Sequence, residues 1–171
     1  MKESAMRHAV SVVGGFALSL FIASMDAWSS EETIPLDQLP KAVSAAVKKR
    51  FPKLEMTEAA KEETDGKTVY EVTVKENGKN IDVTLTPEGV ITTIEKEIAA
   101  KDLPKAVSDG VEKKYPKATY KIVESVTTVT DGKDKIAYYE VLIVTADKKR
   151  MEVEINLDGT IKHEEEKTDE N

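Results

Sequence analysis

The most informative shortage in this sequence is cysteine, of which its 171 residues contain none. A chain without cysteine has no disulfide framework, no thiol nucleophile and no thiolate metal site. Histidine is almost as scarce, since His8 and His163 are the only two. His163 stands beside the acidic run 164–166, and a solvated charged chain end explains this arrangement better than a weak site for a divalent metal.

The familiar motifs of catalysis are also missing. There is no glycine-rich phosphate loop and no G-x-S-x-G sequence. Asp65-Gly66 and Asp131-Gly132 resemble fragments of calcium loops, but each lacks the run of oxygen ligands that such a loop uses and fits a turn better. Carboxylates are abundant, yet nothing in the sequence places two of them in an apolar pocket where a pKa could shift. We therefore predict a protein that is not an enzyme, with no cofactor and no bound metal.

Positive charge is in deficit, because 25 Lys and Arg face 32 Asp and Glu, for a net charge of −7. Nucleic acids bind largely through Lys and Arg that neutralise phosphates, so this balance argues against a nucleic-acid partner. An acidic chain suits a basic partner, or simply remains soluble.

The sequence contains one long hydrophobic run. Ala9–Ala23 is uncharged and mostly apolar, and it follows Lys2 and Arg7. A membrane span needs about 20 residues, whereas a shorter run after a positive segment is typical of a signal peptide. We predict a signal peptide over 1–27, cleaved after Ser24 or Ala27, with an uncleaved anchor as the alternative. Either reading predicts a periplasmic or secreted protein, and cleavage would leave no stable membrane insertion.

One stretch of sequence occurs twice at an offset of 64 residues. Leu39-Pro40-Lys41-Ala42-Val43 leads to Phe51-Pro52-Lys53, and Leu103-Pro104-Lys105-Ala106-Val107 leads to Tyr115-Pro116-Lys117. Self-similarity at a fixed period is strong evidence about architecture. The chain is therefore expected to contain two related modules, each marginal on its own and packed against the other.

Each repeat predicts a helix followed by a β meander. In the first, apolar residues at spacings of three and four predict a helix from near Asp37 that stops before Pro52, and Asp102 is the expected N-cap of the second helix. Alternation and turn residues such as Asn77-Gly78 predict four strands after each helix. The expected fold class is α+β, with two tandem modules that each pack one helix on an antiparallel four-stranded meander sheet. The expected boundaries are a flexible leader over 28–35, a first module over 36–98, a second module over 99–164 and an acidic tail over 165–171.

Differences between the two copies carry the clue to function. The outward row of one strand is polar in the first copy, with Glu71, Thr73 and Lys75, and more apolar in the second, with Tyr138, Leu142 and Val144. A half-exposed antiparallel strand does not need apolar residues on both faces, so something should cover Leu142 and Val144. Either the first module or a loop packs there, or the surface binds a partner protein. These six residues are the candidate partner-binding site.

The repeated motifs resemble the PepSY-like domains that are described as β-lactamase-inhibitor-like. The resemblance rests on L-P-x-A-V, on the aromatic-Pro pair after the helix, on Asp65-Gly66 and Asp131-Gly132, and on Tyr70-Glu71-Val72 and Tyr139-Glu140-Val141. It covers nearly all of 36–164. It implies a secreted or periplasmic bacterial protein whose sheets line up into a concave surface with the helices behind, and in inhibitors of this kind that surface grips an enzyme.

The sequence therefore predicts an exported, non-enzymatic module that binds or inhibits another envelope or secreted protein through the sheet face opposite the helices. The alternative is an envelope protein that binds a small ligand or a divalent metal through its acidic turns and His163.

Overall fold

The computed structural model describes residues 30–64 and 66–168. The predicted signal peptide over 1–27 lies outside them. The strands are β1 (Ser30–Thr33), β2 (Met56–Thr64), β3 (Lys67–Glu76), β4 (Lys79–Leu85), β5 (Ile91–Glu97), β6 (Thr119–Thr130), β7 (Lys133–Val144), β8 (Arg150–Asn156) and β9 (Ile161–Glu166). The α-helices are α1 (Lys41–Arg50) and α2 (Lys105–Lys114), each preceded by a short 3-10 helix, η1 (Leu36–Gln38) and η2 (Ala100–Asp102).

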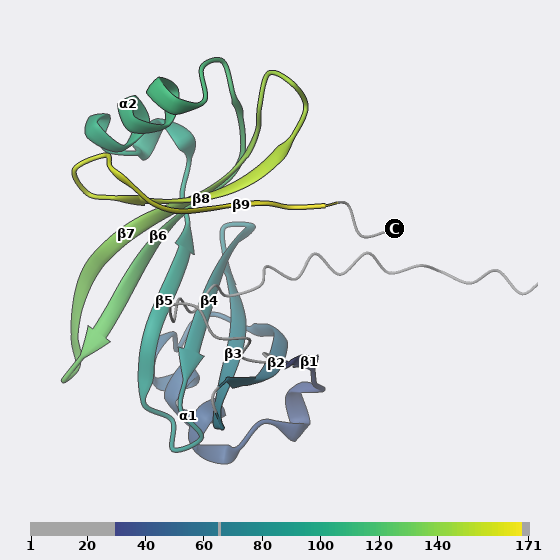
Figure 1. The fold of residues 1–171 in the computed structure, drawn as a ribbon. Helices are drawn as coiled ribbons and strands as arrows, with labels where there is room; N and C mark the ends of the chain where they lie inside the picture. Colours follow the sequence, from purple (N-terminus) through teal and green to yellow (C-terminus); the bar gives the residue numbers. More distant parts are fainter. Residues whose placement is uncertain (1–29, 65, 169–171) are drawn as a thin grey trace, which may run out of the picture.

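The strands form one continuous antiparallel sheet in which spatial order follows sequence order from β1 to β9 (Figure 1). The prediction of two separate four-stranded sheets is therefore wrong. The two halves join where β5 pairs with β6, from Thr93 opposite Thr128 to Glu97 opposite Glu124. Separate sheets would leave β5 and β6 as edges with unpaired backbone groups, and pairing them satisfies those groups.

The residues expected to form a flexible leader contribute the first strand. Ser30–Thr33 pair with β2, with Ser30 opposite Glu63 and Thr33 opposite Ala60. Ile34 follows directly and is buried in the first core. This strand is rich in acidic residues and lacks the apolar alternation by which an isolated strand is recognised.

Both helices begin later than the sequence predicted. Pro40 and Pro104 occupy the N-cap positions, Asp37 lies in η1, and Asp102, the expected N-cap, is the last residue of η2. Asp102 is therefore not the cap of α2. Proline has no N–H to lose at the start of a helix, and it disfavours helical geometry in the residue before it, so the break falls at Leu39 and Leu103.

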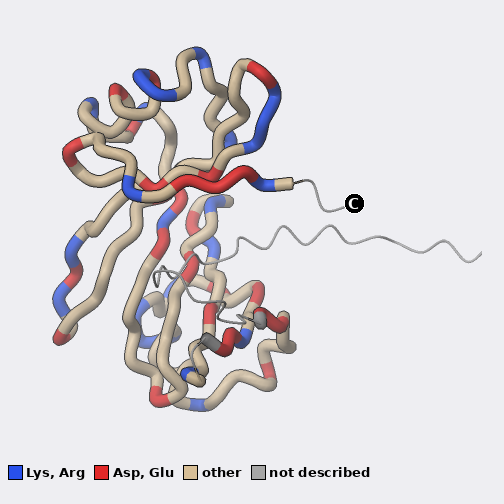
Figure 2. Tube along the Cα trace, in the orientation of Figure 1, with Lys and Arg blue, Asp and Glu red and all other residues tan. Residues whose placement is uncertain are grey.

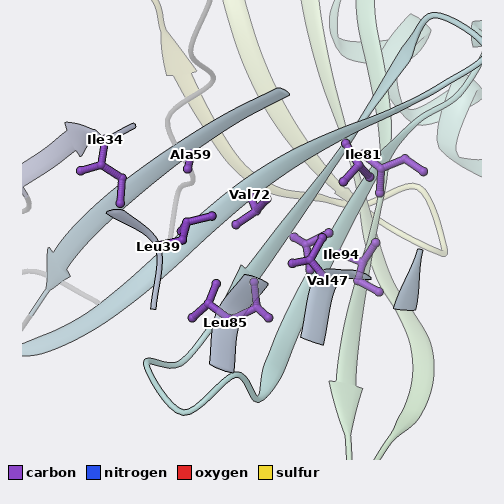
Figure 3. Close-up of a cluster of buried hydrophobic side chains, with 11 residues drawn as sticks. Ile34, Leu39, Val47, Ala59, Val72, Ile81, Leu85 and Ile94 are labelled. Atoms are coloured by element: carbon purple, nitrogen blue, oxygen red, sulfur yellow. The ribbon is translucent and has the colours of Figure 1, made fainter. Parts of the chain in front are cut away.

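Two hydrophobic cores lie on the same face of the sheet. In the first, Val43 and Val47 of α1 pack with Val72, Val83 and their neighbours. Figure 3 labels Val47 and Val72 within this cluster. The second has the same plan, with the corresponding helix valines packed on β7 and β8. Ile94 belongs to the first core and lies opposite Thr127 in the β5–β6 pairing. Paired residues lie on the same face of a sheet, so the core face of the first half continues into the second. Each helix therefore covers its own half of a shared sheet.

The second half also reaches back onto the first. Hairpin β6–β7 is longer than β2–β3, in keeping with the five extra residues between helix and matching strand in the second repeat. Val129 packs against the first core, and Arg50 forms an ion pair with Asp134 near the tip. The extra length thus adds a second connection between the halves.

Candidate functional site

The six residues predicted as a site share one face of the sheet, opposite the helices. In β3 they alternate with Val72 and Val74, and in β7 they alternate with Val141 and Ile143, all of which are core residues. The structure therefore brings together on one face Glu71, Thr73, Lys75, Tyr138, Leu142 and Val144.

These residues differ in accessibility. Leu142 is only 5% exposed, whereas Val144 and Tyr138 are half-buried and Lys75 is exposed. Thr73 is buried and donates a hydrogen bond of 2.6 Å from Oγ1 to Asp82 Oδ1. The apolar strand is thus not a broad exposed patch, and the accessible part of the predicted site is more polar than its sequence suggested.

Between β3 and β7, the intervening strands contribute carboxylates to the same face. Asp82 alternates with core residues of β4, as Glu95 does with Ile94 and Glu124 with Val123. Figure 2 shows acidic positions recurring along neighbouring strands in both halves of the sheet. We call the set of one carboxylate from each of six consecutive strands the acidic row: Glu71, Asp82, Glu95, Glu124, Glu140 and Glu154.

The strand register sets these carboxylates against one another. Asp82 pairs directly with Glu95 across β4 and β5. Glu140 pairs with Glu124 on one side and with Glu154 on the other. Directly opposed side chains have Cβ atoms about 5 Å apart, and like charges at such positions destabilise the sheet. The row is therefore arranged at a cost to folding.

Positive charge compensates only part of this row. At the β9 end, Lys162 Nζ lies 2.5 Å from Glu154 Oε2, and Lys167 Nζ lies 3.2 Å from the neighbouring Glu152. Within the part of the chain that the structure describes, no lysine or arginine forms an ion pair with Glu71, Glu95, Glu124 or Glu140. The middle of the row therefore has excess negative charge whenever its carboxyls ionise.

Burial and neighbouring carboxylates raise the pKa of these groups. Burial is the larger cause in each case, and it raises the pKa of Glu95 to about 10 and that of Glu140 to about 9. The same two causes raise the pKa of Glu71 to about 8 and that of Glu124 to about 7. The expectation that no carboxylates lie where their pKa could shift is thus corrected, because desolvation and like charge both favour the neutral acid.

Tyr138 shows how this face accommodates a cation. The Nζ atom of Lys162 lies 3.8 Å from the centroid of the Tyr138 ring while it contacts the Glu154 carboxylate. An ammonium over an aromatic face is attracted by the ring quadrupole. Burial, followed by Glu154 and other carboxylates, raises the pKa of the Tyr138 phenol. The Tyr138 ring and the Glu154 carboxylate together form a binding site for a lysine side chain.

The described residues contain no group of three or more potential metal ligands that converge on one point. His163 lies directly opposite Glu154 in the β8–β9 register. The acidic row extends across six strands, so its oxygens do not surround a single ion. In the same described ranges, no helix is long and apolar enough to cross a membrane.

The sequence contains a pattern that indicates the acidic row, but the pattern can be interpreted only when the pairing of the strands is known. Asp82, Glu124 and Glu154 each stand between apolar residues in a period-two pattern. That pattern gives the face of each carboxylate but not its neighbours. Because the two modules were expected to have separate sheets, residues of β4, β5 and β6 could not be placed in one row.

The family of the chain follows from a match to a family model. The model, described as "Putative beta-lactamase-inhibitor-like, PepSY-like", matches twice, at residues 24–93 and 88–163. These two matches span most of the chain and agree with the tandem helix-and-meander plan. The chain belongs to this PepSY-like family.

Solved structures with the same fold come from Bacteroides species. A "putative periplasmic" protein of Bacteroides eggerthii has a TM-score of 0.60 at 14% identity and covers 74% of this chain and 88% of its own. A DUF2874 family protein of Bacteroides uniformis has a TM-score of 0.59 at 16% identity, with 74% and 88% covered. A BLIP-like protein of Bacteroides fragilis has a TM-score of 0.55 at 17% identity, with 77% and 88% covered. At these identities the likeness establishes the fold.

A search of curated proteins found no significant match.

Proposed function

We propose that this protein is an exported, non-enzymatic binding module that contacts another protein through the sheet face opposite the helices. The contact surface is the acidic row with the predicted residues around it, above all Tyr138 and Lys75. The protein acts in the periplasm.

The acidic row is the observation that carries this proposal. A sheet face that only had to fold would not set Glu140 between Glu124 and Glu154, because each opposition costs stability. Side chains held in destabilising surroundings are enriched at functional sites.

The comparisons support the location and the general role. The similar Bacteroides eggerthii protein is described as periplasmic, which agrees with the predicted signal peptide. The family description and that of the Bacteroides fragilis protein both refer to β-lactamase inhibitors, which act by binding a protein. We carry over from them a protein partner and leave the identity of that partner open.

Site-specific photo-crosslinking tests which face is used. A photoreactive amino acid replaces the exposed Lys75 on the proposed face, and a second variant carries it at the exposed Lys113 of α2. In cells of the native host, the Lys75 variant should give a discrete crosslinked band of one size, and the Lys113 variant should not.

Equal crosslinking from both positions, or a band from Lys113 alone, would refute the proposed surface. Circular dichroism of the two purified variants provides the control, because both must keep the fold of the parent chain.

A further inference from the structure

In the acidic row, Lys162 pairs with Glu154, but Glu71, Glu95, Glu124 and Glu140 have no ion-pair partner in the described part of this chain. Its six positions lie on six adjacent strands, with Asp82–Glu95, Glu124–Glu140 and Glu140–Glu154 directly opposed. Adjacent strands are about 4.8 Å apart, so the row extends over about 24 Å. A ligand that neutralises it must therefore be elongated.

Glu154 adds an observation that is independent of the row's composition. Its side chain is 1% exposed, and its Oε2 atom accepts a hydrogen bond from Lys162. Its other oxygen, Oε1, is buried and has no hydrogen-bond partner. An unsatisfied buried oxygen is costly, and a carboxylate oxygen can be satisfied only by a donor. The row thus has an unfilled acceptor at one end, and in its middle it has carboxyls without an ion-pair partner among the described residues.

We propose that the acidic row binds an extended, lysine- or arginine-rich segment of the partner protein. This inference rests on the proposed function and specifies the chemistry of the partner. A segment of about seven residues matches the length of the row, since an extended chain rises about 3.3 Å per residue. Alternate side chains of such a segment point to the same side at intervals of about 6.6 Å, so about four cations lie along the six carboxylates.

Lys162 already shows the mode of contact. Its ammonium lies between the Glu154 carboxylate and the Tyr138 ring, at 2.5 Å from the former and 3.8 Å from the ring centroid. The partner's cations repeat this contact at Glu95, Glu124 and Glu140, where the described residues provide none. The half-buried Tyr138 and Val144 lie on the same face and offer apolar contacts to the stems of long basic side chains.

Two other occupants fit less well. A nucleic acid would place its negatively charged phosphates beside a row of carboxylates, which would repel them. A single metal ion would need ligands that converge, and no such group is present among the described residues. A linear polyamine has the charge and the length but lacks side chains to contact Tyr138 and Val144, so it becomes an outcome of the test.

The test is a binding titration of the full-length protein with a labelled peptide of alternating lysine and serine, eight residues long, followed by fluorescence anisotropy at low salt. The test variant is E95Q/E140Q, which replaces two carboxyls in the middle of the row by amides that cannot ionise when a cation approaches, while keeping side-chain shape. The matched control is E55Q/E112Q, which makes the same replacement at two exposed positions, one after α1 and one in α2. Circular dichroism verifies the fold of both.

We expect E95Q/E140Q to weaken binding of the lysine peptide by about tenfold or more, and E55Q/E112Q by less than about twofold. A peptide with glutamate in place of lysine should not bind. Equal weakening by the two variants would overturn the proposal, because it would show attraction to net charge alone, and so would failure of the lysine peptide to bind the parent protein. If spermine binds as tightly as the peptide, the ligand of the acidic row is a polyamine and the proposal of a protein segment is wrong.

Failure here is distinguishable from failure of the proposed function. If crosslinks from Lys75 persist while the lysine peptide does not bind, the face binds a partner that is not basic. If the Lys75 crosslinks are absent as well, the sheet face itself is not the binding surface.

Discussion

Glu95 illustrates how one residue can be favourable for a site and unfavourable for the fold. It is 6% exposed, faces Asp82 directly and has a pKa of about 10. Glu154 has similar burial but a lysine within ion-pair distance. Glu95 thus combines burial, which is the main cause of its raised pKa, with the lack of an ion-pair partner among the described residues.

The substitution E95Q should stabilise the protein at neutral and alkaline pH. At pH 8 the unfolded chain releases the Glu95 proton while the native state retains it, and glutamine removes this penalty. This pH is about 3.5 units above the ordinary pKa of 4.5 that the carboxyl has in the unfolded chain. One pKa unit corresponds to about 1.4 kcal/mol, so we expect a gain of about 3–5 kcal/mol in the free energy of unfolding. Urea denaturation at pH 8 measures it.

The same substitution should give little gain at pH 4, where the carboxyl is protonated in both states. E112Q, at an exposed position of α2, is the control and should change stability by less than about 0.5 kcal/mol at either pH. A loss of stability on E95Q at pH 8 would contradict the account of the acidic row.

At the scale of elements, the contact between α2 and the β8–β9 turn explains a residue that helix propensity disfavours. Gly110 lies in the middle of α2, where glycine costs about 1 kcal/mol relative to alanine. A Cβ atom at this position would lie far inside contact distance of the backbone carbonyl of Gly159. The corresponding residue of α1 is Ala46, so the first half has room for a methyl group at this helix position and the second half does not.

G110A should therefore destabilise the protein, although propensity alone predicts a gain. We expect a loss of about 1–3 kcal/mol in the free energy of unfolding, because backbone has to move to admit the methyl group. K113A in the same helix is the control for propensity, since Lys113 is exposed, and it should be nearly neutral. Thermal denaturation of both variants measures the difference, and a rise in melting temperature for G110A would refute the close contact.

At the scale of the whole molecule, one sheet unites two helix-and-meander repeats and continues one face through both. The β5–β6 pairing and the long β6–β7 hairpin join the halves, and the acidic row crosses the junction between Glu95 and Glu124 (Figure 1). Half of the row comes from each repeat. The acidic row therefore exists only in the joined molecule.

The pH dependence of stability is a property of the whole molecule, because the contributions of all the carboxyls in the acidic row add together. The native pKa values of about 8 for Glu71, 7 for Glu124 and 9 for Glu140 all lie above the ordinary value of 4.5. Between about pH 5 and pH 9 the native state therefore binds more protons than the unfolded state, and the free energy of unfolding falls as pH rises.

Thermal melts followed by circular dichroism should accordingly give a higher midpoint at pH 5 than at pH 9. The variant E95Q/E140Q should have a flatter profile, because two of the groups no longer titrate. A midpoint that rises from pH 5 to pH 9 would show that the row ionises as freely as exposed carboxylates.

Local patterns predicted much of the fold, including the repeat, both helices and the strands that follow them. They placed the six candidate residues on one face correctly, because period-two alternation fixes which side of a strand a residue occupies. They missed strand β1, whose Ser-Glu-Glu-Thr sequence has no apolar alternation, and they misplaced the helix starts by giving Pro40 and Asp102 the wrong positions.

What the sequence determined by itself is local: two repeats of a helix and a meander, and the face to which each side chain points. Only the tertiary structure decided that the two meanders form one sheet, since pairing of β5 with β6 depends on backbone groups that every residue carries and that no side-chain pattern marks. That pairing aligns carboxylates from both repeats, and burial among like charges then gives them pKa values that no single strand could impose.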